Sequence, residues 1–228
     1  MSESNYTTTT FNDSYISETS ELLFNAKLGL TINRLLFKNW PNEAIQRKNY
    51  RAVLENLDRS KTEALSVVDN ASGEVVAHLS ITRKQPLAKR GQNILSSNED
   101  KEQTKDAEVP EYFNPVVLSA VQSAVAELAR GLGDIDHLEL TYIIVKPEHR
   151  GCGIGIRLME LVFSKAEALG LPVALSSEPQ VYDFFIKRGF KDTKYVDFDL
   201  AKWAPPYSGF GMFRLAGLIW YPKIGGYT

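Results

Sequence analysis

A strand-turn-helix pattern at residues 140–171 sharply limits the folds open to this 228-residue chain. A run of apolar and β-branched residues ends at Pro147, glycines then follow on alternate positions, and an amphipathic helical pattern comes next. This order predicts a strand, a tight turn and the N-terminus of a helix. Because the backbone N–H groups of such a turn and the helix dipole point to one place, the pattern favours a bound phosphate or pyrophosphate.

Other glycine-rich motifs match this turn less well. A P-loop needs Lys followed by Ser or Thr after its last glycine, and no such pair follows here. A dinucleotide fingerprint counted from Gly151 needs a third Gly or Ala, and that position holds Ile156. A further alternative is a turn in which the glycines are needed only for steric reasons, although the fixed charge of Arg150 favours an anion site.

The turn resembles the pyrophosphate loop of the GNAT N-acetyltransferase family, whose pattern is Gln/Arg-x-x-Gly-x-Gly/Ala. A second resemblance follows at residues 180–190, QVYDFFIKRGF, which are similar to the family's short helix ending in Tyr-x-x-x-Gly-Phe. The two signatures occur in the family's order, about one helix and one strand apart. The resemblance implies that acetyl-CoA is the co-substrate. It also implies that the turn binds it through Arg150, Gly151, Cys152, Gly153, Ile154 and Gly155.

The same resemblance implies an α/β fold of the GNAT type, with a mixed, mostly antiparallel sheet flanked by helices. Residues 1–20 are rich in Ser, Thr and Asn, and we expect them to be disordered or loosely draped. Residues 21–228 then form one acetyltransferase domain with an insertion at about residues 84–136. A polar loop begins this insertion and a helical pattern at residues 116–132 follows. The helix either forms one wall of a substrate site or decorates the surface.

Acyl transfer from a thioester to an amine needs a neutral amine and a stabilised oxyanion. Glu139 is the candidate base, because a charge on a strand with a buried pattern needs a role or a partner. It precedes Arg150 by the eleven residues that separate the catalytic glutamate from the loop in the histone-acetylating branch of the family. Alternatively, Glu139 lies at the exposed start of the strand or pairs with a basic residue. By resemblance, the backbone N–H groups of Ile144 and Val145 bind the thioester and pantetheine arm.

The proton donor for the leaving thiolate is where this sequence departs from the family. The family's Tyr lies four residues before the Gly of the second signature, and here that position holds Phe185, which cannot donate a proton. The resemblance still places Phe185 beside the cofactor. Tyr182, one helical turn earlier, either acts as the general acid or packs in the core. A thiolate whose conjugate acid has a pKa of about 8.5 can also leave unaided.

Composition excludes several other functions. The net charge of −2 gives no electrostatic footprint for nucleic acid or an anionic membrane. One cysteine and three scattered histidines offer no metal-ligand spacing, so we expect no metal. The N-terminal residues lack a signal-peptide pattern, which predicts a cytoplasmic protein. The aromatic residues of segment 197–228 predict core packing or a homodimer contact.

These observations predict an acetyl-CoA-dependent N-acetyltransferase. The long insertion favours a primary amine of a small molecule as the acceptor, attacked directly with the help of a glutamate base. The alternatives are a protein or peptide N-acetyltransferase and a catalytically weak acyl-CoA-binding sensor. The segments FKNWPN and GLPVALSSEP are similar to those of fungal members of the family, and this similarity implies no particular substrate.

Overall fold

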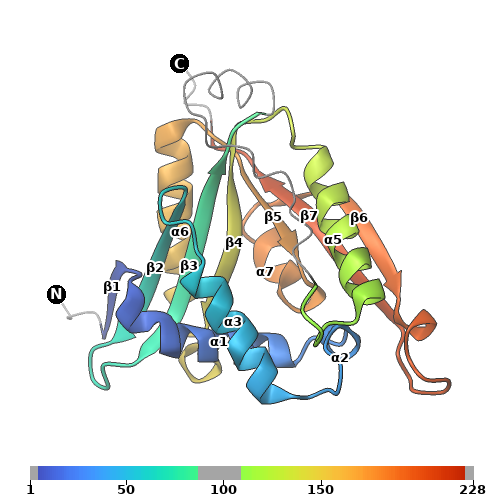
Figure 1. The fold of residues 1–228 in the computed structure, drawn as a ribbon. Coiled ribbons are helices and arrows are strands. Elements are labelled where there is room, and N and C mark those ends of the chain that lie inside the picture. The colour runs from blue at the N-terminus through green and yellow to red at the C-terminus, as the bar shows by residue number, and fades with distance from the viewer. Residues whose placement is uncertain (1–4, 87–108, 224–228) are drawn as a thin grey trace, which may run out of the picture.

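The computed structural model describes residues 5–86 and 109–223. Its strands form one sheet in the order β1-β2-β3-β4-β5-β7-β6, and every neighbouring pair is antiparallel except β4 with β5. The predicted mixed, mostly antiparallel sheet is therefore confirmed (Figure 1). The strands are β1 (Tyr6–Thr10), β2 (Thr62–Asp69), β3 (Val75–Lys84), β4 (His137–Val145), β5 (Val173–Ser177), β6 (Lys191–Asp199) and β7 (Met212–Trp220).

Helices cover both faces of this sheet (Figure 1). On the face toward the viewer, α1 and α3 lie over β3 and β4, and α5 lies over β6 and β7. On the opposite face, α6 and α7 bury the main hydrophobic core. The helices are α1 (Ile16–Leu28), α2 (Asn33–Leu36), α3 (Glu43–Glu55), α5 (Pro115–Arg130), α6 (Ile154–Leu169) and α7 (Tyr182–Ile186). No helix in the described residues is long and apolar enough to cross a membrane.

Residues 6–20 are ordered, although residues 1–20 were predicted to be disordered or loosely draped. Strand β1 pairs with β2 from Tyr6 opposite Asp69 to Thr10 opposite Leu65, and α1 begins at Ile16. The prediction is wrong for residues 6–20 because a polar run of β-branched threonines suits an edge strand that faces solvent on one side. Residues 1–4 lie outside the described residues.

The predicted helix in the insertion is confirmed as α5. The Asn114 side chain accepts a hydrogen bond from the backbone N–H of Val116 (3.1 Å), which together with Pro115 begins the helix. Its buried residues, Val117, Ala124 and Leu128, pack in a cluster with side chains of β6 and β7. The polar loop predicted before this helix falls largely on residues 87–108, outside the described part of the chain.

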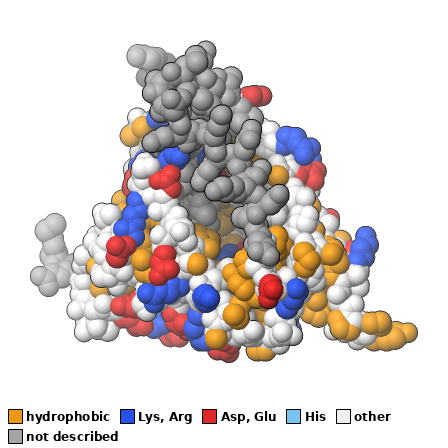
Figure 2. Space-filling view, viewed as in Figure 1, with side chains coloured by type: hydrophobic (Ala, Val, Ile, Leu, Met, Phe, Trp, Pro, Cys, Tyr) orange, Lys and Arg blue, Asp and Glu red, His pale blue; other side chains and the backbone are white. Residues whose placement is uncertain are grey.

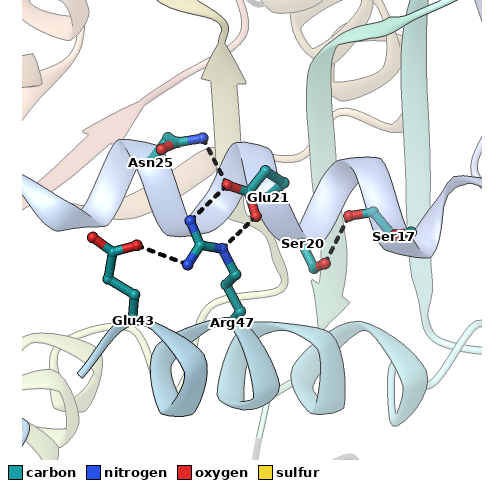
Figure 3. Close-up of polar contacts among 6 residues, drawn as sticks. All are labelled: Ser17, Ser20, Glu21, Asn25, Glu43 and Arg47. Carbon is teal, nitrogen blue, oxygen red and sulfur yellow. Dashed lines mark hydrogen bonds and ion pairs between the residues drawn. The ribbon is translucent and has the colours of Figure 1, made fainter. Parts of the chain in front are cut away.

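Helices α1 and α3 are joined by a polar contact centred on Arg47 (Figure 3). The Arg47 guanidinium donates to Glu21 of α1 (2.8 Å) and to Glu43 of its own helix (2.8 Å), and it lies 4.1 Å from the ring centroid of Phe24. A planar guanidinium can make these contacts simultaneously. The contact fixes α1 relative to α3, and therefore also fixes the C-terminal end of α1.

Beneath α1, the sheet carries fully buried polar side chains. His78 of β3 is fully buried, with its ring 5.1 Å from that of Phe11 in an edge-to-face arrangement. Its cross-strand partner Ser66 and its same-face neighbour Ser80 are also fully buried. Burial lowers the pKa of His78 to about 4 because the charged imidazolium is costly in this environment.

This pKa shift predicts an acid-sensitive fold. Between pH 6.5 and 4 the unfolded chain binds a proton at His78 that the folded chain does not bind, so the free energy of unfolding should fall as pH decreases through this range. The loss should reach about 3 kcal/mol at pH 4. His78→Phe should remove this component, as measured by denaturant unfolding at pH 7 and pH 4.5. An unchanged pH slope in the variant would contradict the assignment.

Candidate active site

The site is built on the separation of two parallel strands. β4 and β5 pair at only two positions, Leu138 with Val173 and Glu139 with Ala174. Beyond them, residues 140–145 of β4 have no partner toward β5, a length of roughly 20 Å at about 3.3 Å per residue. An unpaired strand edge within a sheet offers N–H and C=O groups to a ligand. Val145 presents its backbone N–H and C=O to this edge. The predicted N–H contact from Ile144 does not fit, because Ile144 lies opposite His78 in the same hydrogen-bonding phase as Lys146, whose N–H donates to Val76 of β3.

A β-bulge in β4 changes which of its side chains lie on the side of α1 and α3. Ile81 pairs with Leu140 and Ser80 pairs with Tyr142, so Thr141 is the extra residue. As a result, Leu140 packs in the core under α6, whereas Tyr142 packs on the side of α1 and α3. The bulge therefore directs an aromatic hydroxyl toward the α1 side of the opening between β4 and β5.

The predicted anion-binding turn follows the open end of β4. Gly151 and Gly153 have φ of +79°, a conformation that L side chains rarely adopt, and Gly153 precedes the first residue of α6. No side chain caps α6, so the N–H groups of its first turn are available to a ligand. Arg150 is exposed beside them and donates from Nε to the carbonyl of Val145 (3.1 Å).

The six predicted loop residues thus lie together in one turn, with different roles. Ile154 is buried in the core and contributes only its backbone, while Cys152 is exposed. A Cβ at Gly155 would lie 3.5 Å from the Phe184 ring and 3.7 Å from Val145. Uncapped N–H groups, the α6 dipole and a guanidinium match the chemistry of a pyrophosphate. In the described residues, no group of three or more His, Cys, Asp or Glu could hold a metal.

The residues considered for proton donation have other contacts. Phe185 is 4% exposed and packs against Phe184 and Phe190. The Tyr182 hydroxyl lies 2.9 Å from each carboxylate oxygen of Asp192 on β6, which makes it a donor to that carboxylate. The structure therefore commits Tyr182 to a contact with β6 and puts an apolar ring at position 185.

Glu139 lies at the closed end of the strand opening. It is one of the two β4 residues paired with β5, and its carboxylate forms an ion pair with Lys84 (3.1 Å). Its side chain is 39% exposed. This is the second alternative noted from the sequence, in which Glu139 pairs with a basic residue.

A second carboxylate, which the sequence analysis did not consider, lies at the open end. Glu178 directly follows β5 and forms an ion pair with Lys27 at the end of α1. Burial is the main cause that raises the pKa values of Tyr50 and Tyr142, and the charge of Glu178 raises both further. Asn33 donates to the carbonyl of Lys27 (3.0 Å) and to the Tyr50 hydroxyl (3.4 Å).

We call these five residues the Glu178 cluster: Lys27, Asn33, Tyr50, Tyr142 and Glu178. They come from α1, α2, α3, β4 and the residue after β5, and they extend from position 27 to position 178, so no local spacing could have revealed them. The available signal was a carboxylate immediately after a buried strand, just before Pro179. The cluster brings together a carboxylate, an ammonium and two phenols beside the opening between β4 and β5.

Comparisons with known proteins agree with this geometry. Residues 116–192 match the sequence model of the acetyltransferase (GNAT) domain. Among solved structures, an acetyltransferase from Corynebacterium glutamicum described as histone acetyltransferase HPA2 and related acetyltransferase has a TM-score of 0.57 at 14% identity, covering 99% of this chain and 100% of that one. A search of curated protein sequences finds no match.

Two further solved structures have the same fold. Arylalkylamine N-acetyltransferase 2 from Aedes aegypti has a TM-score of 0.55 at 12% identity, covering 96% of this chain and 99% of that one. An N-acetyltransferase from Staphylococcus aureus Mu50 has a TM-score of 0.54 at 14% identity, with coverage of 96% and 99%. The chain therefore has the fold of the GNAT acyltransferases. The match over residues 116–192 supports a relationship to that family, whose general co-substrate is acetyl-CoA.

The turn yields a test that separates ligand binding from folding. Gly155→Glu puts a carboxylate in the first turn of α6, where it should stabilise the helix by a few tenths of a kcal/mol or more. The same carboxylate should repel a pyrophosphate and lower the affinity for coenzyme A at least roughly 10-fold, measured by calorimetry. The control is Leu161→Glu, an equal charge at an exposed position further along α6. Equal affinities in the two variants would remove the turn from the binding site.

Proposed function

We propose that the protein is an acetyl-CoA-dependent N-acetyltransferase that acts on the primary amine of a small molecule. The observation that carries this proposal is the arrangement of three features at one opening. The uncapped α6 turn suits the pyrophosphate, the free edge of β4 suits the pantetheine arm, and the Glu178 cluster lies beside the gap. The backbone N–H groups of residues 140–145 that point away from β3, including that of Val145, supply hydrogen bonds to the arm and the thioester oxygen.

Glu178 is the better-placed base of the two carboxylates. A protonated alkyl amine must lose a proton before it can attack the thioester, and a carboxylate at the open end can accept it directly or through water. Both carboxylates are ion-paired with a lysine, but Glu178 is at that end, whereas Glu139 is at the closed end. The amine nitrogen then attacks the carbonyl carbon, the C–S bond breaks, and the CoA thiolate leaves.

The thiolate leaves without a dedicated proton donor. Phe185 has no hydroxyl, and the hydroxyl of Tyr182 is used by Asp192. A CoA thiolate is a weak base, since thiols have a pKa of about 8.5, so protonation from solvent after departure is sufficient.

The packing of α5 supports a small acceptor over a peptide. α5 shares a hydrophobic cluster with the segment after α1 and with β6 and β7. The backbone N–H of Lys38 donates to the carbonyl of Tyr112 (2.8 Å), and that of Asn114 donates to the carbonyl of Leu36 (2.8 Å). The segment after α1 is therefore hydrogen-bonded to the start of α5. In Figure 2, hydrophobic side chains gather in the lower middle of this face, between the two groups of helices. An extended peptide that crossed the opening would be blocked by this contact between the segment after α1 and α5.

The Aedes aegypti structure with this fold is described as an arylalkylamine N-acetyltransferase, which is consistent with a small amine.

The choice of base is tested by two matched substitutions. Glu178→Gln should lower kcat roughly 10²-fold or more, the scale of a positioned general base, and the loss should shrink at high pH as the amine deprotonates without help. Glu139→Gln should change kcat by less than about 3-fold, because its carboxylate lies away from the reacting atoms. CoASH release across an amine panel gives both values, and acetyl-CoA affinity measured for each variant shows that the site is intact. The reverse ranking would make Glu139 the base.

The proton donor is tested at two aromatic positions. Tyr182→Phe should leave kcat within about 2-fold of wild type, since the Tyr182 hydroxyl binds Asp192 rather than the thiol. Phe185→Tyr should give no gain in kcat, because that ring is buried among other aromatic rings. A loss of roughly 10-fold in Tyr182→Phe that is not explained by lower stability would instead identify Tyr182 as the general acid.

A further inference from the structure

The ion pair between Lys27 and Glu178 differs from the other lysine pairs in its burial. The Lys27 and Glu178 side chains are 22% and 21% exposed. In the described residues, every other lysine–carboxylate pair has both side chains at least 32% exposed. Removing two charges from water is costly, and such a pair adds little net stability, so stability alone does not account for it.

Neighbouring groups fix the position of the Lys27 amine. Asn33 holds the carbonyl of Lys27 at the end of α1, and Arg47 fixes α1 against α3. On the carboxylate side, Gln180 donates to the second oxygen of Glu178 (3.1 Å). The ammonium is therefore directed to one carboxylate oxygen at the end of β5, beside the gap in which β4 has no partner.

From this placement we propose that Lys27 is a self-acetylation site, in which the chain's own amine takes the place of the acceptor amine. The inference rests on the proposed function, because the acetyl donor is acetyl-CoA. A primary alkyl ammonium next to the carboxylate base presents the same chemistry as the proposed acceptor. Holding the two reactants in one molecule replaces a bimolecular encounter, which can raise the rate by several orders of magnitude.

The reaction balances without any further reagent. The Lys27 ammonium transfers a proton to Glu178, and the neutral nitrogen attacks the thioester carbonyl carbon. The new C–N bond forms, the C–S bond breaks, and the CoA thiolate leaves. Glu178 passes this first proton to solvent and then accepts the second amine proton, and the thiolate is protonated from solvent. The products are an N-acetyl-lysine at position 27, CoASH and one released proton.

Acetylation would change the site that performs it. The acetyl-lysine side chain is neutral, so Glu178 would lose its counter-ion, and the acyl group would occupy space beside Tyr142. The external acceptor and Lys27 compete for the same carboxylate. A saturating good acceptor should therefore slow the modification.

The test uses the full chain and acetyl-CoA that carries a ¹³C-labelled acetyl group. Peptide mass spectrometry measures the acetylation of each lysine over time. Lys27 should be labelled at least roughly 10-fold faster than Lys84 and Lys165, two ion-paired lysines that report background acylation. Because the step is intramolecular, its rate constant should not change when the protein is diluted. Glu178→Gln should slow labelling of Lys27 and leave the two control lysines unchanged, and Lys27→Arg should abolish the fast labelling.

Two measurements keep this inference separate from the proposed function. Acetyl-CoA binding by calorimetry and CoASH release across an amine panel are measured on the same preparation. Binding and amine turnover with Lys27 labelled no faster than Lys84 and Lys165 would overturn the inference alone. Labelling that rises with protein concentration would overturn it too, since transfer would then be between molecules. Failure of acetyl-CoA to bind would remove both proposals.

Discussion

The short pairing of β4 with β5 is the constraint on which the whole site depends. β4 is paired along eight positions with β3, and β5 along five positions with β7, but the two strands meet each other at only two. The sheet therefore consists of two well-paired halves that separate after Glu139 and Ala174. Because every buried backbone group tends to be hydrogen-bonded, the free edge left at this separation is a place where a ligand's amide groups can substitute for a strand.

Packing on both faces holds this separation open. The core beneath α6 and α7 contains residues from β3, β4, β5 and β7, so it spans both halves of the sheet. On the other face, α1 and α3 belong to the half that contains β4, and α5 belongs to the half that contains β6 and β7. The two helical groups meet where Phe37 contacts Phe113, with ring centroids 5.0 Å apart. The opening is therefore backed on one face by a core common to both halves of the sheet, and on the other face the two helical groups are in contact.

Charge in this protein is informative chiefly where it is buried. Most ion pairs among residues 5–86 and 109–223 are exposed and contribute little to stability, because water screens them and the long side chains lose entropy. The Glu139–Lys84 pair is also exposed, which weakens the argument that a charge on this strand must be catalytic. The pair of Lys27 and Glu178 is shielded from water and lies next to two phenols. Its electrostatic effect on bound groups is correspondingly larger.

Local sequence determined the strand, turn and helix of residues 137–169, because positive φ at Gly151 and Gly153 and the 3.6-residue period of α6 are properties of neighbouring residues. It also predicted α5, whereas the mixed sheet was expected only from the resemblance to the GNAT family. Local sequence did not predict that β1 is an ordered strand. Its run of threonines has the composition of a disordered segment, and it becomes a strand only by pairing with the edge of β2. Nor could local sequence choose between Glu139 and Glu178. That choice depends on where β4 and β5 separate and on which helix end brings a lysine to the gap. These are contacts between residues as distant as 27 and 178, and only the tertiary structure decides them.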